Sequence, residues 1–311
     1  MKEKQKSFVS AIVYLHQNES EIIPFLHVVH SVLSENFEQF ELVFVNDASA
    51  DRSRDTLKQA ASRFSGCMVS ILNMSYYQGL EASMCAGVDL AIGDFIFEFD
   101  TAVIDYDPEL ILQVFHRCQS GFDIVACGKE TERPASMLFY YVYNRSSGAQ
   151  YRLKSETFRL ISRRGINRVN AMNVSLPYRK AVYANCGLKM DFIAYTPTVL
   201  DSGGRRKTAL KNPQDTALTS LILFTNFAYR ATLAFTFLMM LATVGSIAYV
   251  VAVYVMGNPV EGYTTIMMLS SGAFFALFAI QAVVIKYLSV ILGLVFQKQR
   301  YVVESIEKIT E

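Results

Sequence analysis

Between residues 8 and 127, short apolar runs alternate with longer helix-like segments. The runs are rich in β-branched and aromatic residues, which favours β-strands, and they cover residues 7–16, 41–46, 68–73, 94–99 and 122–127. The helix-like segments between them cover residues 19–34, 51–64, 79–91 and 108–119. This alternation predicts an α/β fold with a mostly parallel sheet covered by helices on both faces.

A different pattern governs residues 231–285, where Glu261 is the only charged residue. A turn signal at residues 257–259 (GNP) divides this stretch into residues 231–256 and 263–285. Each part is long enough to cross a hydrocarbon core about 30 Å thick, which takes about 20 helical residues. We therefore predict two transmembrane helices. A buried helical hairpin in a large soluble core is the alternative that this pattern allows.

Positive charges flank the two apolar segments and are missing from the loop between them. The flanking residues are Arg205, Arg206, Lys207, Lys211, Arg230, Lys286, Lys298 and Arg300. The positive-inside rule then places the bulk of the chain and its C-terminus in the cytoplasm. The apolar run near the N-terminus is too brief for a signal peptide. We expect an integral membrane protein.

These patterns divide the chain into four parts. Residues 1–214 are predicted to form a cytoplasmic domain, and residues 231–285 form the two membrane helices. Residues 215–230 are apolar with a few polar positions, which favours an interfacial amphipathic helix; an extension of the first span fits them equally well. Residues 286–311 mix apolar and charged positions, which predicts a cytoplasmic amphipathic helix.

Charge and cysteine content exclude several classes of protein. Lys and Arg number 29 against 28 Asp and Glu, a formal net charge of +1. Such a balance argues against nucleic acid as the main partner, because nucleic-acid binding usually needs a strongly basic face. The 5 cysteines form no CxxC pair, so neither a disulfide framework nor a cysteine-based zinc site is expected.

Polar side chains follow several of the predicted strands. Asn18 and Glu19 come after the first strand, Asn46 and Asp47 after the second, and Asp100 after the fourth. Ligands of open α/β sheets bind beyond the carboxyl ends of the strands. Carboxylates at that edge can hydrogen-bond a base or ribose, or hold a divalent cation that bridges phosphates. Each residue alone could equally be a helix cap, but together they favour a binding site.

Several short motifs occur in an order that is more specific than any one of them. They are residues 18–19 (NE), 45–51 (VNDASAD), 79–87 (GLEASMCAG), 91–94 (AIGD), 158–160 (FRL) and 298–301 (KQRY). With these motifs and two terminal spans, the chain resembles the family-2 glycosyltransferases that use polyprenyl phosphate as acceptor. That group contains dolichol-phosphate mannose synthase and bacterial membrane glucosyl- and arabinosyl-transferases. The resemblance covers nearly the whole chain and implies a GT-A fold.

The resemblance implies transfer of a sugar from a UDP- or GDP-linked donor to the phosphate of a polyprenol. It assigns nucleotide binding to Asn18, Glu19, Asp47, Asp51 and Asp100. A Mg²⁺ or Mn²⁺ ion bound through an Asp-x-Asp motif would neutralise the leaving diphosphate as a Lewis acid. The resemblance leaves a homo-oligomer open, because the family includes tetramers.

Further roles follow from the same resemblance. Asp100, Asp105 and Arg159 are the candidate catalytic residues, and Asp100 with Asp105 forms the candidate metal site. The basic residues Arg205, Arg206 and Lys207 would suit the acceptor phosphate, although positive-inside topology explains them equally well.

The chain departs from the family pattern at three positions. Ala102 stands where the second carboxylate of Asp-x-Asp is expected, Thr157 replaces the Asp before FRL, and Leu80 replaces a lysine. A threonine hydroxyl cannot act as a base near neutral pH, although an acceptor that is already a phosphate anion does not need one. Two hypotheses therefore stand: an active membrane glycosyltransferase, and an impaired relative that binds nucleotide-sugar or lipid, or assembles with a partner.

Overall fold

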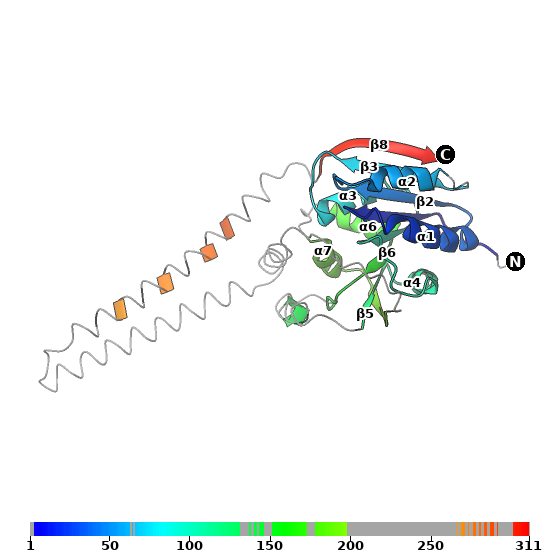
Figure 1. Ribbon diagram of the computed structural model, residues 1–311. Coiled ribbons are helices and arrows are strands. Elements are labelled where there is room, and N and C mark those ends of the chain that lie inside the picture. The colour runs from blue at the N-terminus through cyan, green and yellow to red at the C-terminus, as the bar shows by residue number, and fades with distance from the viewer. Residues whose placement is uncertain are drawn as a thin grey trace, which may run out of the picture. The chain divides into compact units, whose positions relative to one another are not determined.

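The computed structural model describes residues 3–62, 64, 66–130, 137, 140, 141, 143–145, 151–172, 178–197 and 301–310, with single helical positions between 266 and 291 (Figure 1). The chain divides into two compact units. One comprises residues 1–144, 149–216 and 299–311, and the other comprises residues 145–148 and 217–298. The elements described below belong to the first unit.

In the described part of the chain, one sheet has the strand order β7-β5-β6-β4-β1-β2-β3-β8. Its strands are β1 (Val9–Leu15), β2 (Phe40–Asn46), β3 (Met68–Met74), β4 (Phe95–Phe99), β5 (Ile124–Lys129), β6 (Phe158–Ser162), β7 (Met190–Tyr195) and β8 (Val303–Thr310). Only β6 and β8 run antiparallel to their neighbours. The predicted α/β fold with a mostly parallel sheet is therefore confirmed.

Helices cover both faces of this sheet, as the continuous apolar character of buried parallel strands requires. The helices are α1 (Ile22–Asn36), α2 (Ser53–Ala61), α3 (Leu80–Leu90), α4 (Glu109–Gln119), α6 (Arg163–Ala171) and α7 (Arg179–Asn185). Alternate β1 residues, from Val9 to Leu15, pack with α1, α2 and α4 in the main apolar core. Helix α3 packs against β1, β2 and β3, over the opposite face.

Close packing of α3 on the sheet depends on Gly87. A Cβ atom at this position would lie 2.5 Å from Cγ2 of Ile12 and 2.8 Å from Cγ2 of Val45. Because real Cβ atoms do not approach other atoms so closely, any larger residue would force α3 away from β1 and β2. Gly87 thus sets the distance between α3 and the sheet, and thereby the position of the turn that precedes α3.

The C-terminal tail differs from its prediction. A helix was expected over residues 286–311, but residues 303–310 form β8, which pairs antiparallel with β3 (Figure 1). The tail alternates half-buried and exposed side chains with a period of two. Val303, Ile306, Ile309 and Thr310 are β-branched and favour a strand. Without β8, the backbone groups of β3 on that side would have no strand to pair with.

Most of the predicted membrane region lies outside the described residues. This holds for the interfacial helix at 215–230, the first span at 231–256 and most of the second span at 263–285. Among the residues that the structure does describe, no helix has both the length and the apolar character needed to cross a bilayer.

Candidate functional site

The loops that follow β1 and β2 are joined to each other at the carboxyl edge of the sheet. The Asn18 amide donates to Oγ of Ser53 at 3.0 Å, and the Glu19 amide donates to Oδ2 of Asp51 at 3.3 Å. Asp51 also accepts from the Ser53 amide at 3.2 Å, at the start of α2. Three of the predicted nucleotide-binding residues, Asn18, Glu19 and Asp51, are therefore brought together, and each takes part in loop structure.

Asp47 lies at the end of β2 and holds a third loop in place. Its side chain is fully buried. Oδ1 accepts from the Gln78 amide at 2.7 Å, while Oδ2 accepts from the Gly79 amide at 2.8 Å and from the Tyr14 hydroxyl at 2.9 Å. Gly79 has φ of +87°, a value that favours glycine. Asp47 thus fixes the turn before α3 and acts as a positioning residue at this edge.

Two residues without glycine's freedom adopt left-handed backbone conformations at the same edge. Gln17 has φ of +56° and Ala48 has φ of +47°. The Gln17 amide donates to Oγ of Ser49 at 3.3 Å, so the two strained turns are in contact. Such strain costs of order 1–3 kcal/mol per residue and clusters at functional sites. Its position therefore supports a binding edge here.

A buried ion-pair cluster lies beyond β4 and involves Asp100. Arg159 of β6 donates through Nη2 to Oδ2 of Asp100 at 3.0 Å, and Arg179 of α7 donates through Nη2 to Oδ1 at 2.8 Å. Both arginines also bind Oε2 of Glu98, Arg159 at 2.8 Å. The arginine side chains are only 1% exposed. The structure thus brings the candidate catalytic residues Asp100 and Arg159 together.

Two further carboxylates anchor these arginines from outside the cluster's centre. Nε of Arg159 donates to Glu156 at 2.9 Å, and Nε of Arg179 donates to Glu81 of α3 at 2.8 Å. The hydroxyl of Tyr183 completes the cluster by donating to Oε1 of Glu98 at 2.7 Å. We call Glu81, Glu98, Asp100, Glu156, Arg159 and Arg179 the arginine cluster.

Electrostatics within the arginine cluster favour the charged forms of Asp100, Arg159 and Arg179. Burial alone would raise the pKa of Asp100, but the guanidinium groups of Arg159 and Arg179 outweigh it and hold the pKa at about 2. The pKa of each arginine is raised in turn, because the neighbouring carboxylates outweigh burial. Removing one partner of a buried pair commonly costs about 3–5 kcal/mol, since the other charge is left uncompensated.

Arg179 and its anchors were not predicted as site residues. An isolated arginine followed by lysine carries no recognisable spacing, and hydropathy treats such residues as exposed. The one available signal was Glu98, a carboxylate inside an apolar strand (FIFEF). Because both faces of β4 are covered, a charge there needs a buried partner.

Asp105, the other predicted metal ligand, belongs to a different network. The Tyr195 hydroxyl donates to its Oδ1 at 2.8 Å, and Lys129 forms an ion pair with Oδ2. Because Tyr195 gives its only proton to Asp105, the Thr157 hydroxyl donates to Tyr195, at 2.8 Å. The structure therefore engages Asp100 and Asp105 with separate partners.

The residues at Asp100 do not fit a divalent cation in this arrangement. Both carboxylate oxygens of Asp100 accept hydrogen bonds from guanidinium groups, and Ala102 contributes no ligand. Across the described residues, no group of three or more His, Cys, Asp or Glu side chains is placed to hold a metal. The predicted acceptor-phosphate residues Arg205, Arg206 and Lys207 lie outside the described residues.

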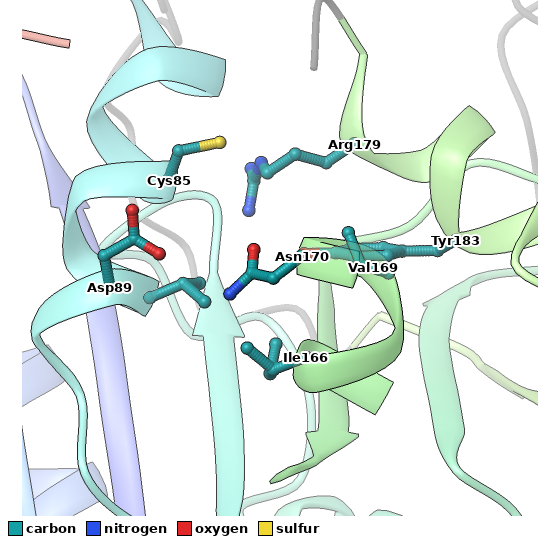
Figure 2. Close-up of a pocket in the computed structure, with 8 residues that line it drawn as sticks. Cys85, Asp89, Ile166, Val169, Asn170, Arg179 and Tyr183 are labelled. Atoms are coloured by element: carbon teal, nitrogen blue, oxygen red, sulfur yellow. The ribbon is translucent and has the colours of Figure 1, made fainter. Parts of the chain in front are cut away.

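A small pocket adjoins the arginine cluster, between α3, α6 and α7. Figure 2 shows Arg179 extending from α7 toward Cys85 of α3, with Asn170 of α6 beside it. The cavity volume is about 10 Å³, room for about one water molecule. Burial raises the pKa of Cys85 to about 12, so its thiol stays protonated. This pocket is too small to hold a nucleotide-sugar.

Comparison with known proteins relates this geometry to a family. The Glycosyl transferase family 2 model matches residues 10–186. An uncharacterized glycosyltransferase of Synechocystis is 25% identical over 195 residues, and this match spans 60% of each chain. A prophage bactoprenol glucosyl transferase homolog of Escherichia coli is 26% identical over 265 residues, covering 80% of this chain and 83% of its own length.

Solved structures show the same fold. A glucosyl-3-phosphoglycerate synthase of Mycobacterium tuberculosis, solved in complex with Mn²⁺, UDP and phosphoglyceric acid, aligns with a TM-score of 0.51 at 11% identity. The alignment covers 70% of this chain and 78% of that one. At this level of identity the similarity concerns the fold alone, and it supports the expected GT-A-like architecture.

Proposed function

The chain belongs to glycosyl transferase family 2, and from this premise we propose that it transfers a sugar from a UDP- or GDP-linked donor to polyprenyl phosphate. The proposal rests on one observation: the motif residues lie together at one edge of the sheet. Strands β1, β2 and β4 are parallel neighbours, so the loops after Leu15 and Asn46 and the side chain of Asp100 share their carboxyl edge. Ligands of open α/β sheets bind there.

The acceptor follows from the relative named for bactoprenol, which matches most of this chain. We propose that Arg205, Arg206 and Lys207 bind the lipid phosphate by charge-assisted hydrogen bonds. Two membrane helices at residues 231–256 and 263–285 would hold the enzyme in a bacterial inner membrane, with the catalytic domain on the cytoplasmic side. Holding lipid phosphate and donor together makes an encounter between two molecules effectively unimolecular.

The proposed reaction needs no base from the protein. An anionic oxygen of the lipid phosphate attacks C1 of the sugar and forms the new C–O bond. The bond from C1 to the donor's diphosphate oxygen breaks, and the nucleoside diphosphate leaves with the electron pair. Thr157 cannot accept a proton near neutral pH, and this step does not require it to, because the nucleophile is already charged.

One observation favours a second candidate function. Asp100 is fully engaged by Arg159 and Arg179, and Ala102 and Thr157 lack the carboxylates that the resemblance leads one to expect. An impaired homologue that binds nucleotide-sugar or lipid, or assembles with a partner, would tolerate these changes. The two functions differ in whether a lipid-linked sugar is formed.

The deciding experiment is a transfer assay with the full-length protein in membranes. Radiolabelled UDP- and GDP-sugars are supplied with polyprenyl phosphate, and organic-phase radioactivity measures lipid-linked sugar. We expect one donor to give product, and Asp100→Ala to abolish it, whereas Asp55→Ala on the exposed side of α2 should retain full activity. Full activity of Asp100→Ala would contradict the assignment, and no product with any donor would favour the impaired homologue.

A further inference from the structure

The two carboxylates predicted to bind a cation are already bound to the protein's own cations or donors. The oxygens of Asp100 accept from Arg179 at 2.8 Å and from Arg159 at 3.0 Å. The oxygens of Asp105 accept from Tyr195 and pair with Lys129. A hard dication needs several oxygen ligands that it can approach directly. At these two residues each oxygen is already paired with a donor or cation of the protein.

The guanidinium groups next to the Asp100 oxygens also oppose a cation bound directly to them. A dication within bonding distance of an Asp100 oxygen would lie beside two guanidinium groups in a site that is 9% exposed. Lys180 adds a third positive charge that acts on Asp100. Like charges repel strongly where solvent cannot screen them.

The guanidinium groups cannot simply move aside. Arg159 is bound to Glu98, Asp100 and Glu156, and Arg179 is bound to Glu81, Glu98 and Asp100. Displacing either arginine would remove one of the two guanidinium groups that bind Glu98, which is fully buried, and would leave Glu81 or Glu156 without its arginine partner. The arginines therefore belong to the framework of the site.

We propose that Arg159 and Arg179 take the place of a divalent cation at Asp100, so that this chain binds its donor without Mg²⁺ or Mn²⁺ at that residue. The inference rests on the proposed function for the identity of the donor, but the metal binding itself is measured separately. It makes Arg159 and Arg179 the residues that determine the metal requirement of the site.

The direct test is a titration of the full-length, detergent-purified protein with Mn²⁺, followed by the electron paramagnetic resonance signal of the unbound ion. We expect Asp100→Asn to bind as much Mn²⁺ as the natural sequence. Stoichiometric Mn²⁺ binding that Asp100→Asn abolishes would overturn the proposal. Thermal stabilisation by UDP or GDP should also be the same in EDTA as in Mn²⁺, and a shift that requires both Mn²⁺ and Asp100 would overturn it as well.

Removing Arg179 tests whether a cation can bind at the site once the arginine is absent. Arg179→Met leaves Glu81, Glu98 and Asp100 facing one another without their shared cation, and we expect Mn²⁺ to raise the melting temperature of this variant. Arg117→Met, which removes a half-exposed arginine from a surface pair, should respond to Mn²⁺ no more than the natural sequence does. If Mn²⁺ stabilises the natural sequence as much as Arg179→Met, the arginine does not replace a cation.

The proposed function and this inference can fail separately. Absence of any lipid-linked sugar would reject transfer while leaving the Mn²⁺ titration to decide the inference. Mn²⁺ bound through Asp100 in an enzyme that forms lipid-linked sugar would reject the inference and retain the function.

Discussion

Asp100→Asn gives a quantitative test of the arginine cluster, because the change removes one charge and keeps the side-chain shape. The pKa of Asp100 falls from an ordinary 3.8 to about 2 in the folded protein. Each pKa unit corresponds to about 1.4 kcal/mol, so the charge contributes about 2 kcal/mol to the free energy of unfolding at pH 7. The asparagine NH₂ group would also face an arginine donor, which makes this figure a lower bound.

The stabilisation by the charge of Asp100 depends on pH with a definite sign. Because the folded-state pKa lies below the unfolded one, the stabilisation is fully present above about pH 4 and is lost as the pH falls through about 2. The stability gap between the natural sequence and Asp100→Asn should therefore close over this window.

Urea unfolding of the full-length protein in detergent, followed by circular dichroism at neutral and acidic pH, measures the stability difference between the two proteins and its dependence on pH. Asp55→Asn, an exposed carboxylate in the first turn of α2, is the matched control, and its effect should stay within about 0.5 kcal/mol. Equal unfolding free energies for the natural sequence and Asp100→Asn at pH 7 would refute the reasoning. A gap that is the same at pH 7 and pH 2 would refute it too.

Three further changes test the packing around the site by urea unfolding and hydrogen exchange. Ala48→Gly should stabilise the fold by about 0.5–1 kcal/mol, because it removes the strain of an alanine in the left-handed backbone conformation. Ala50→Gly is the control: without that strain, the change should destabilise the fold, and equal effects of the two changes would argue against strain at Ala48. Gly93→Ala would place a Cβ 2.7 Å from a backbone nitrogen of β1 and should cost about 1–3 kcal/mol, so an unchanged urea midpoint would contradict the packing. Gln78→Ala removes two hydrogen bonds to the Val302 backbone and should speed amide exchange in β8, whereas unchanged protection would show that β8 does not depend on them.

The first five strands and four helices followed from local pattern, because each buried strand is a nearly continuous apolar run. The later elements did not. Strand β6 is only 5 residues long and contains Arg159, a residue type that hydropathy treats as exposed. For the residues of β8, local pattern predicts a helix, because these 8 residues continue the mixed apolar and charged pattern of the preceding tail and nothing in that pattern indicates pairing with β3. Pairing between distant segments decided both cases, and local pattern carries no information on it.

The same limit applies to the site. The positions of Asn18, Glu19 and Asp47 after the first two strands predict that these residues lie at one edge of the sheet, because the carboxyl ends of parallel strands share an edge. Their individual contacts were not predictable, because Asp47 binds backbone amides of the turn before α3, which no motif spacing encodes. Arg179 was missed for a related reason: its partners come from β4 and from α3, far apart in the chain.

The charges of the arginine cluster relate Ala102 to the pairing of Asp100 with arginines. The four carboxylates of the cluster face two arginines, and Lys180 adds a third positive charge, which leaves one net negative charge. A carboxylate at the buried position 102, two residues after Asp100, would add a further negative charge, and a dication would compensate that excess. With Ala102 at this position, the chain's own cations nearly suffice. The absence of a carboxylate at position 102 and the pairing of Asp100 with arginines are therefore consistent parts of a single arrangement, in which protein cations take the place of a metal ion.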